Sequence, residues 1–225
     1  MKSELAGFAP PPWPERVALI GDYTRLEPID DACHGDALFE ASSVPDVEVR
    51  FRWLFDQPPA DRAALRAWIA QTALVADPVC FAVVDAASGL AEGRQSLMRI
   101  TPQHGVIEIG SIYWGPRISR SRVATEAQFL FAQYVFDTLG YRRYEWKCDA
   151  LNEPSRRAAL RFGFRFEGVF RQHMVIKGMN RDTAWFAMID REWPALKAGY
   201  ERWLDAANFD GAGVQRRSLG ECLRH

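Results

Sequence analysis

The sequence predicts a mixed α/β fold built around one strand, one loop and one long helix in the middle of the chain. Residues 106–114 alternate their side chains with the period of two expected of a strand, and Gly115-Pro116 ends the pattern. An arginine-rich loop follows, and an amphipathic helix begins at Ser121 or Val123 and ends at Gly140. Because the first N–H groups of a helix lack partners and attract anions, this segment predicts an anion-binding site.

The other elements follow from hydrophobic periodicity and from capping and turn residues. Asp30 or Asp31, and Asp61, are expected to cap the first two helices. Residues 42–59 show no period and are expected to form a loop with aromatic anchors. We expect a bulged strand or hairpin over 17–29, helices over 32–41, 60–71, 121–140, 152–163 and 193–207, and strands over 80–84, 96–101, 106–114, 143–148, 164–175 and 183–189.

Alternation along the central strand also predicts which side chains share a face of the sheet. Glu108, Ile112 and Trp114 are expected on one face, and Ile109 and Tyr113 on the other.

Length and composition indicate one soluble domain. The chain has 225 residues, of which 48% are hydrophobic and 25% charged, enough for one large core. A net charge of -1 and the lack of a long apolar run predict no nucleic-acid partner, no membrane association and a cytoplasmic location. We expect residues 1–16 to be an extended proline-rich lead-in, 17–207 to be the single domain, and 208–225 to be a disordered tail.

The cysteines do not indicate a metal centre. Cys33, Cys80, Cys148 and Cys222 share no short spacing and no accompanying histidine pattern. Free thiols, and no bound metal, are therefore expected.

The arginines of the central loop allow two interpretations. Arg117, Arg120 and Arg122 stand near a helix N-terminus, where each cation is unfavourable by some tenths of a kcal/mol (roughly) unless an anion lies among them. Glu126 can neutralise the charge of only one of these arginines. The cluster either binds a phosphate-bearing ligand or consists of three solvated surface side chains.

Three segments carry a resemblance to a known family. They are Trp114-Gly-Pro-Arg with the following Arg-Val-Ala-Thr-Glu-Ala127, Phe136 to Arg143, and Asn152 to Phe164. Over residues 17–191 the chain resembles the GCN5-related N-acetyltransferase (GNAT) superfamily, and in particular the branch of ribosomal-protein N-terminal acetyltransferases. The resemblance implies a mostly antiparallel mixed sheet of six to seven strands, flanked by about four helices and splayed between the fourth and fifth strands.

The resemblance also implies acetyl-coenzyme A as the acyl donor, with its pyrophosphate on the arginine loop. The family signature falls on Ser119 to Ala124, where Ser119 replaces a basic residue and Arg122 replaces a glycine. We interpret Arg120 and Arg122 as side-chain substitutes for a glycine-flanked backbone. The implied cofactor-binding residues are Ile112, Tyr113, Trp114, Arg117, Arg120, Ser121, Arg122, Val123, Ala124, Thr125, Asn152 and Ser155.

Two side chains are implied to move protons. Ser155 lies where related enzymes place a proton donor, and Glu108 where histone-acetylating relatives carry a base, although Glu108 also fits a solvated strand position. Asn152 either contacts the pantetheine arm or simply caps its helix. The implied acceptor pocket contains Phe51, Trp53, Arg171 and Lys177; His173 lies in the same region and is given no role.

The resulting prediction is an N-acetyltransferase that moves an acetyl group directly to a primary amine, either a protein N-terminus or a small molecule. A weak base site favours an α-amine, whose pKa is about 7.8. The alternatives are another acyl donor such as succinyl-coenzyme A, suggested by the basic residues, or a non-catalytic module that binds coenzyme A or a protein. The protein is expected to be a monomer or a homodimer.

Overall fold

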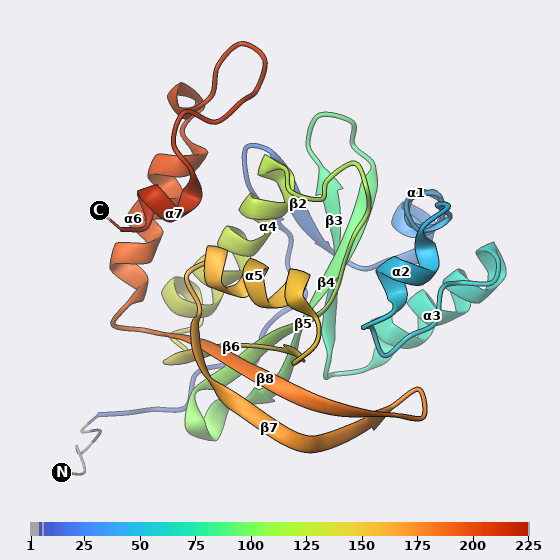
Figure 1. Ribbon diagram of the computed structural model, residues 1–225, viewed down its shortest axis with the longest axis horizontal. Coiled ribbons are helices and arrows are strands. Elements are labelled where there is room, and N and C mark those ends of the chain that lie inside the picture. Colours follow the sequence, from blue (N-terminus) through green and yellow to red (C-terminus); the bar gives the residue numbers. More distant parts are fainter. Residues whose placement is uncertain (1–4, 6, 225) are drawn as a thin grey trace.

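The structure is a computed structural model that describes residue 5 and residues 7–224 (Figure 1). It contains one eight-stranded sheet in the order β1-β2-β3-β4-β5-β6-β8-β7, in which β5 and β6 run parallel and all other neighbours run antiparallel. The strands are β1 (Leu19–Ile20), β2 (Thr24–Pro28), β3 (Val79–Asp85), β4 (Ala91–Thr101), β5 (Val106–Trp114), β6 (Arg143–Asp149), β7 (Arg165–Ile176) and β8 (Met179–Ile189).

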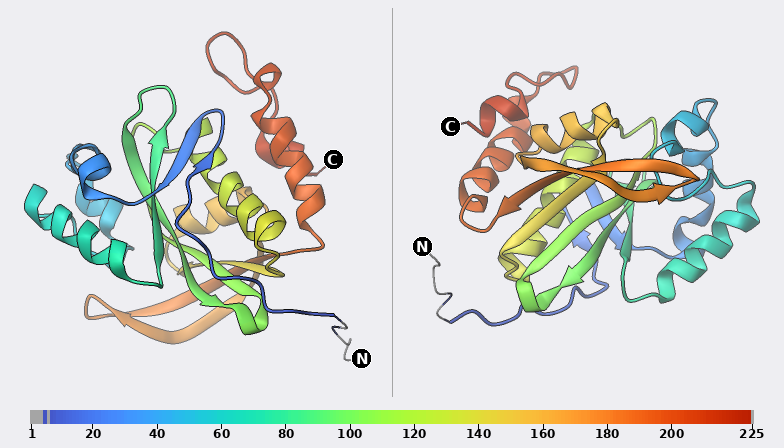
Figure 2. Two further views of the ribbon diagram at one scale, coloured as in Figure 1. Left: turned by 180° about the vertical axis from the view of Figure 1, so that it is seen from behind. Right: turned by 60° about the horizontal axis from the view of Figure 1, so that its bottom comes forward.

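Helices cover both faces of the sheet, as the two views of Figure 2 show. A small core, which includes Ile29, Leu38 and Ile69, lies under α1 and α3, and a much larger core lies under α4 and α6. The helices are α1 (Asp31–Ser42), α2 (Val47–Phe51), α3 (Arg62–Leu74), α4 (Arg122–Gln133), α5 (Glu153–Arg161), α6 (Trp193–Leu204) and α7 (Leu219–Cys222), and a π-helical turn (Tyr134–Thr138) extends α4.

The predicted helix starts are confirmed by their caps. Asp30, Asp61 and Ser121 each accept a hydrogen bond from a backbone N–H in the first turn of α1, α3 and α4. The mixed α/β class is also confirmed, but eight strands and seven α-helices exceed the six to seven strands and about four helices expected. The turn at Gly21 divides the first segment into β1 and β2, and the five residues of α2 are too few to show a period in the sequence.

The C-terminal segment is ordered, which contradicts the predicted disorder of 208–225 as far as residue 224. Phe209 pairs with Gln215, and Ser218 forms a capping box at the start of α7. Leu219 and Cys222 are each 1% exposed and belong to the large core. The burial of these two side chains against α6 orders a segment that is otherwise polar.

The predicted lead-in is only partly described, because residues 1–4 and 6 lie outside the described residues. From Phe8 to Ala18 the chain forms no regular structure, so the first strand begins two residues later than predicted. It lies against the end of the α4 segment, where Tyr134 Oη accepts a hydrogen bond from Glu15 N at 2.9 Å. Among the described residues, no helix is both long and apolar enough to cross a membrane.

The only parallel pair of the described sheet separates part-way along its length. β5 and β6 pair from Val106 with Arg143 to Ile109 with Trp146, and their pairing stops there. β5 nevertheless follows β4 as far as Trp114, and β6 follows β8 as far as Asp149. The two strands therefore diverge, which confirms the predicted splay between the fourth and fifth strands of the sequence-based count.

A β-bulge in β5 corrects the predicted faces of this strand. Ser111 has a φ of 51°, and the register with β4 shifts between Gly110 and Tyr113. The bulge inserts one extra residue into β5, so the side chains after it point to the faces opposite to those predicted. Ile112 and Trp114 therefore pack against the large core together with Ile109, whereas Tyr113 points to the other face.

Candidate active site

The gap between β5 and β6 opens into a cleft of about 370 Å³. Its walls come from both diverging strands, the start of α5, the segment after α2, and β8. Beyond Ile109, the backbone groups of β5 that point toward β6 face this gap instead of a paired strand. The cleft thus offers strand-like hydrogen-bonding groups to a ligand.

One end of the cleft leads to the N-terminus of α4. Among the described residues, the backbone N–H groups of Arg120, Arg122 and Val123 have no hydrogen-bond partner. Ser121 caps the helix, and Arg120 adopts a left-handed conformation with a φ of 62°. These free N–H groups lie at the helix start where the sequence predicts an anion-binding site, and such groups favour anions.

The arginine side chains of the loop do not cluster as predicted. Arg117 Nη1 pairs with Oε1 of the buried Glu92 at 2.7 Å. The Arg122 guanidinium lies between two aromatic rings, 4.5 Å from Tyr23 and 4.3 Å from Phe209.

Arg120 is exposed and forms no ion pair within the described part of the chain. Among the loop side chains it is therefore the one that remains available for a phosphate. The backbone N–H of Arg122, and not its guanidinium, belongs to the anion site.

Glu126 has a structural role and forms no ion pair with the arginines of the loop among the described residues. Its buried carboxylate accepts three backbone hydrogen bonds, from Asp22 at 3.0 Å and from Tyr23 and Thr24 at 2.7 Å each. The contact fixes the β1–β2 turn against the first turns of α4.

Ser155 lies deeper in the cleft, in the first turn of α5. Its Oγ is 2.9 Å from Nε1 of Trp146, which can only donate. The serine oxygen therefore accepts this hydrogen bond, and its own hydrogen is free to point elsewhere. Asn152 caps α5 by accepting from Ser155 N at 3.2 Å, so the capping role is present, while its amide NH₂ group still lines the cleft.

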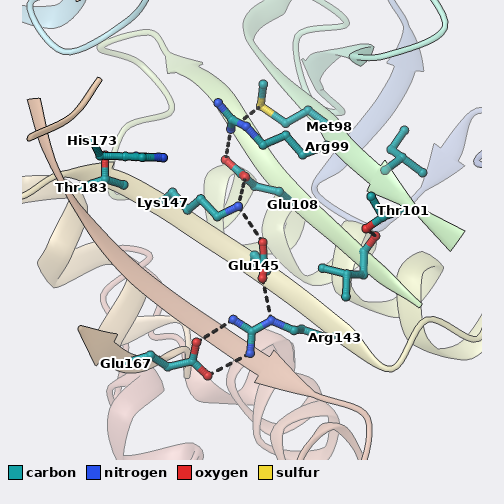
Figure 3. Close-up of polar contacts among 12 residues, drawn as sticks. Met98, Arg99, Thr101, Glu108, Arg143, Glu145, Lys147, Glu167, His173 and Thr183 are labelled. Atoms are coloured by element: carbon teal, nitrogen blue, oxygen red, sulfur yellow. Dashed lines mark hydrogen bonds and ion pairs between the residues drawn. The ribbon is translucent and has the colours of Figure 1, made fainter. Parts of the chain in front are cut away.

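Glu108 lies at the other end of the cleft, within a continuous row of ion pairs (Figure 3). Its Oε1 is 2.7 Å from Arg99 Nη1, and its Oε2 is 2.9 Å from Lys147 Nζ. Lys147 also contacts Glu145 at 2.7 Å, and the row continues through Arg143 to Glu167. Glu108 is buried, 2% exposed, so the interpretation as a solvated strand glutamate is wrong.

Comparison with known proteins identifies this arrangement. The model of the acetyltransferase (GNAT) domain family matches residues 24–165, which is more than half of the chain. The chain belongs to the GNAT family of acetyltransferases. The match covers β5, β6, the loop before α4 and the start of α5, but not β8, which carries Arg181.

Individual GNAT proteins agree with this assignment. A crystal structure of a GCN5-related N-acetyltransferase from Brucella melitensis is 62% identical, covers 98% of this chain and 100% of that one, and superposes with a TM-score of 0.96. A protein from Chromobacterium violaceum ATCC 12472, provisionally described as a GNAT-family acetyltransferase, is 39% identical with a TM-score of 0.79, over 86% of this chain and 96% of that one.

A curated relative from Bacillus subtilis (strain 168), provisionally assigned as ribosomal N-acetyltransferase YdaF, is 29% identical over 106 residues. The match covers 47% of this chain and 57% of that protein. The chain thus matches little more than half the length of this relative.

The four residues expected to form the acceptor pocket do not all meet in this GNAT cleft. Trp53 lines it, whereas Phe51 lines a neighbouring pocket, where the centre of its ring lies 4.8 Å from that of Tyr113. Lys177, at the tip of the β7–β8 hairpin, donates to the carbonyl oxygen of Phe51 at 3.0 Å. Arg171 is exposed in a separate depression on the hairpin, so its predicted place in the pocket is wrong.

The side chain of Tyr113 is structural. Its hydroxyl donates to the Ala41 carbonyl at 2.7 Å, and burial raises the pKa of Tyr113 to about 12. The group thus stays protonated at neutral pH. Only the backbone of Tyr113 remains free for the predicted cofactor role.

Sequence reasoning missed two arginines, one beside the first turn of α4 and one in the cleft. Arg161 in α5 donates to Thr125 Oγ1 at 3.2 and 3.3 Å and forms no ion pair with the described residues, and burial lowers its pKa. Arg181 in β8 lines the opposite part of the cleft. Because Arg181 stands next to Asp182 in the sequence, it would be predicted to lie on the protein surface. Its burial depends on the packing of the β7–β8 hairpin, which the sequence does not show.

The chemistry of the cofactor end fits acetyl-coenzyme A. Free N–H groups at the α4 N-terminus, the Arg120 side chain and the Arg161 guanidinium all favour phosphate oxygens. Unpaired β5 backbone in the gap suits the amide groups of a pantetheine arm. In the part of the chain that the structure describes, no group of three His, Cys, Asp or Glu side chains could hold a metal ion.

Proposed function

We propose that this GNAT protein transfers an acetyl group from acetyl-coenzyme A directly to a primary amine. The observation that carries the proposal is the gap between β5 and β6, whose cleft is lined both by Ser119, in the loop just before α4, and by Ser155. Both substrates would meet in one cleft, so no covalent enzyme intermediate is required.

The donor would be held mainly by backbone groups. The N–H groups of Arg120, Arg122 and Val123 bind the pyrophosphate, with Arg120 as the side-chain clamp. Ile112 and Trp114 hold the pantetheine arm from the edge of β5, together with the free NH₂ group of Asn152. When bound, acetyl-coenzyme A supplies a thioester whose acetyl carbon accepts the amine and whose sulfur leaves as a thiolate.

Ser155 would supply the proton for the departing sulfur. Because its oxygen accepts from Trp146, its hydroxyl hydrogen is free to be donated within the cleft. A thiol with a pKa near 8.5 leaves readily, so we expect this acid to contribute only about 10- to 100-fold, at the low end of general acid catalysis.

Glu108 is a restricted base. Both of its oxygens already have cationic partners, so it must give up a contact with Arg99 or Lys147 before it takes a proton from the amine. An α-amine, with a pKa of about 7.8, loses its proton at pH 7 for about 1 kcal/mol, whereas a lysine side chain requires nearly 5 kcal/mol. The paired state of Glu108 therefore favours an α-amine as the acceptor.

Two measurements test the proposed function. Acetyl-coenzyme A at about 100 times its dissociation constant should stabilise the fold by about 2.7 kcal/mol, seen as a rise in Tm. Release of free thiol should then depend on an added amine, with α-amines preferred over ε-amines. Stabilisation without thiol release from any amine would indicate a binding module, and no stabilisation at millimolar concentrations would contradict both functions.

A further inference from the structure

Arg181 is a buried cation without a partner. It lies in β8, is 7% exposed, and lines the cleft beside Phe55, whose ring centre is 5.3 Å from the guanidinium carbon. Its Nε is fully buried without a hydrogen bond, and the guanidinium forms no ion pair with any residue that the structure describes. Burial lowers the pKa of Arg181, as expected for a cation removed from water.

A second buried arginine shows how this fold satisfies such a group. Arg94 is 5% exposed, pairs with Asp56 Oδ2 at 2.5 Å, donates to Ser111 Oγ at 2.6 Å, and lies 4.2 Å from the ring centre of Trp68. Arg94 thus holds the bulge of β5 against the α2–α3 segment. Arg181, equally buried, lacks every one of these polar contacts.

The acidic groups near Arg181 are already engaged. Glu108 is paired with Arg99 and Lys147, and Asp149 Oδ1 accepts from Leu151 N at 2.8 Å. Three of the four cationic side chains that line the cleft form ion pairs: Arg50 with Asp46, and Arg99 and Lys147 with Glu108. Among the described residues, Arg181 is therefore the cleft cation that no carboxylate neutralises.

Burying a cation without an anion is unfavourable, so such a group is expected where a ligand supplies the anion. We propose that Arg181 binds a carboxylate of the acceptor, and that the substrates are primary amines that also carry a carboxylate. The planar guanidinium suits a carboxylate through two parallel hydrogen bonds. This inference rests on the proposed acetyl transfer and names the class of its acceptor.

The position of Arg181 assigns the carboxylate to the acceptor and not to the donor. The cofactor end is marked by the α4 N-terminus and Arg161, whereas Arg181 faces the segment after α2. The β7–β8 hairpin reaches this segment (Figure 1), where Lys177 contacts the Phe51 carbonyl. The electrostatic neighbours of Arg181 include Glu108, the candidate base.

Steady-state kinetics with paired amines test the proposal. The pairs differ only in the carboxylate: alanine and its amide, β-alanine and its amide, and C-terminally amidated peptides with Asp or Asn as the second residue. We expect the carboxylated member to be preferred by about 10- to 100-fold in kcat/KM. The free amino acids and the peptides distinguish a small-molecule acceptor from a protein N-terminus.

Arg181→Gln should remove this preference by raising KM for the carboxylated amine, without changing the dissociation constant of acetyl-coenzyme A. Arg171→Gln removes the same charge from the outside of the hairpin and should leave the preference intact. An equal preference for both members in the wild-type protein contradicts the Arg181 proposal while the proposed acetyl transfer stands. Absence of transfer to any amine contradicts the proposed function, and the acceptor proposal fails with it.

Two further results would overturn the proposal. In the ligand-free protein, Arg181→Met should raise Tm, because it removes an uncompensated buried charge, whereas Arg94→Met should lower it. A loss of stability in Arg181→Met as large as in Arg94→Met would show that Arg181 is structural. A defect confined to succinyl-coenzyme A, with acceptor preference unchanged, would assign the carboxylate to the donor.

Discussion

The two ends of the cleft offer different kinds of groups to the donor and the acceptor that we propose for them. The donor end presents backbone groups: free N–H groups at the start of α4 and the unpaired edge of β5. The acceptor end presents charged side chains from separate strands, with Arg99, Glu108 and Lys147 paired and Arg181 unpaired. The Arg122 guanidinium lies against Tyr23 and Phe209, so its side chain is held by two rings while its backbone N–H stays without a partner among the described residues.

The acceptor end depends on the identity of each side chain. A change of one charge there alters both the stability of the fold and the choice of substrate. We therefore expect substitutions at the two ends to produce different phenotypes. The following predictions are arranged from the largest effect to the smallest.

Glu108→Gln should have the largest effect on stability. The substitution leaves Lys147, whose side chain is 8% exposed, and Arg99 without their shared carboxylate oxygens. Loss of one partner of a buried pair costs about 3 kcal/mol, measured as a lower urea midpoint at an unchanged m value. The double variant Glu108→Gln, Lys147→Met should recover part of the loss, and no recovery would show that the two residues are not coupled.

Ser155→Ala should lower kcat by about 10- to 100-fold while the dissociation constant of acetyl-coenzyme A stays within about threefold of its wild-type value. The substitution removes the proposed proton donor but leaves the backbone of the donor site unchanged. Ser88→Ala, in an exposed turn, is the matched control. An unchanged kcat in Ser155→Ala would exclude Ser155 as the acid.

Arg120 and Arg122 should behave differently although they are two residues apart. Arg122→Ala loses contacts with two aromatic rings and should destabilise the fold by about 1–2 kcal/mol, with little change in affinity for acetyl-coenzyme A. Arg120→Ala should leave stability unchanged and weaken acetyl-coenzyme A about tenfold. Titration calorimetry and thermal unfolding separate the two effects, and the reverse pattern would contradict the assignment of the anion site.

Glu167→Gln should have the smallest effect and depend on pH. Arg143 contacts both oxygens of Glu167 and holds the pKa of that carboxyl below its ordinary value. A lowered pKa stabilises the fold above the unfolded pKa of about 4.3, and the contribution disappears as the pH falls through the folded pKa.

Since the Glu167 side chain is 43% exposed, the difference from wild type at pH 7 should stay below about 1 kcal/mol. Urea unfolding at pH 7 and at pH 3 measures this difference in the free energy of unfolding. A difference that persists unchanged in acid would exclude the ion pair as its cause.

The donor end could be predicted from the sequence because its parts are contiguous. Gly115-Pro116, the cap at Ser121 and the start of α5 at Asn152 are local signals of strand end and helix start. Gly110, directly before Ser111, is the one sequence signal of the bulge, because a glycine inside a strand often marks one. The faces of β5 were assigned from unbroken alternation and were therefore wrong beyond this residue. The segment from Ser218 did carry a capping-box pattern, which the polar composition around it obscured.

The acceptor end could not be predicted because its residues meet only through tertiary structure. Glu108 and Lys147 come from strands joined by a helix, and Arg181 comes from a hairpin formed later in the chain. A charged residue on a strand can be exposed to solvent, ion-paired, or buried without an ion-pair partner. Which of these occurs depends on the elements that pack over that face of the sheet. Arg171 and Arg181 lie in one hairpin, and only the latter points into the cleft.

Hydrogen–deuterium exchange with and without acetyl-coenzyme A tests the central claim most directly, because it maps which backbone N–H groups the donor covers. We predict slower exchange in peptides that span residues 110–124, including the N–H groups of Arg120, Arg122 and Val123, and unchanged exchange in the β7–β8 hairpin. Protection confined to other segments, or none at saturating acetyl-coenzyme A, would contradict the assignment of the β5–β6 gap as the donor site.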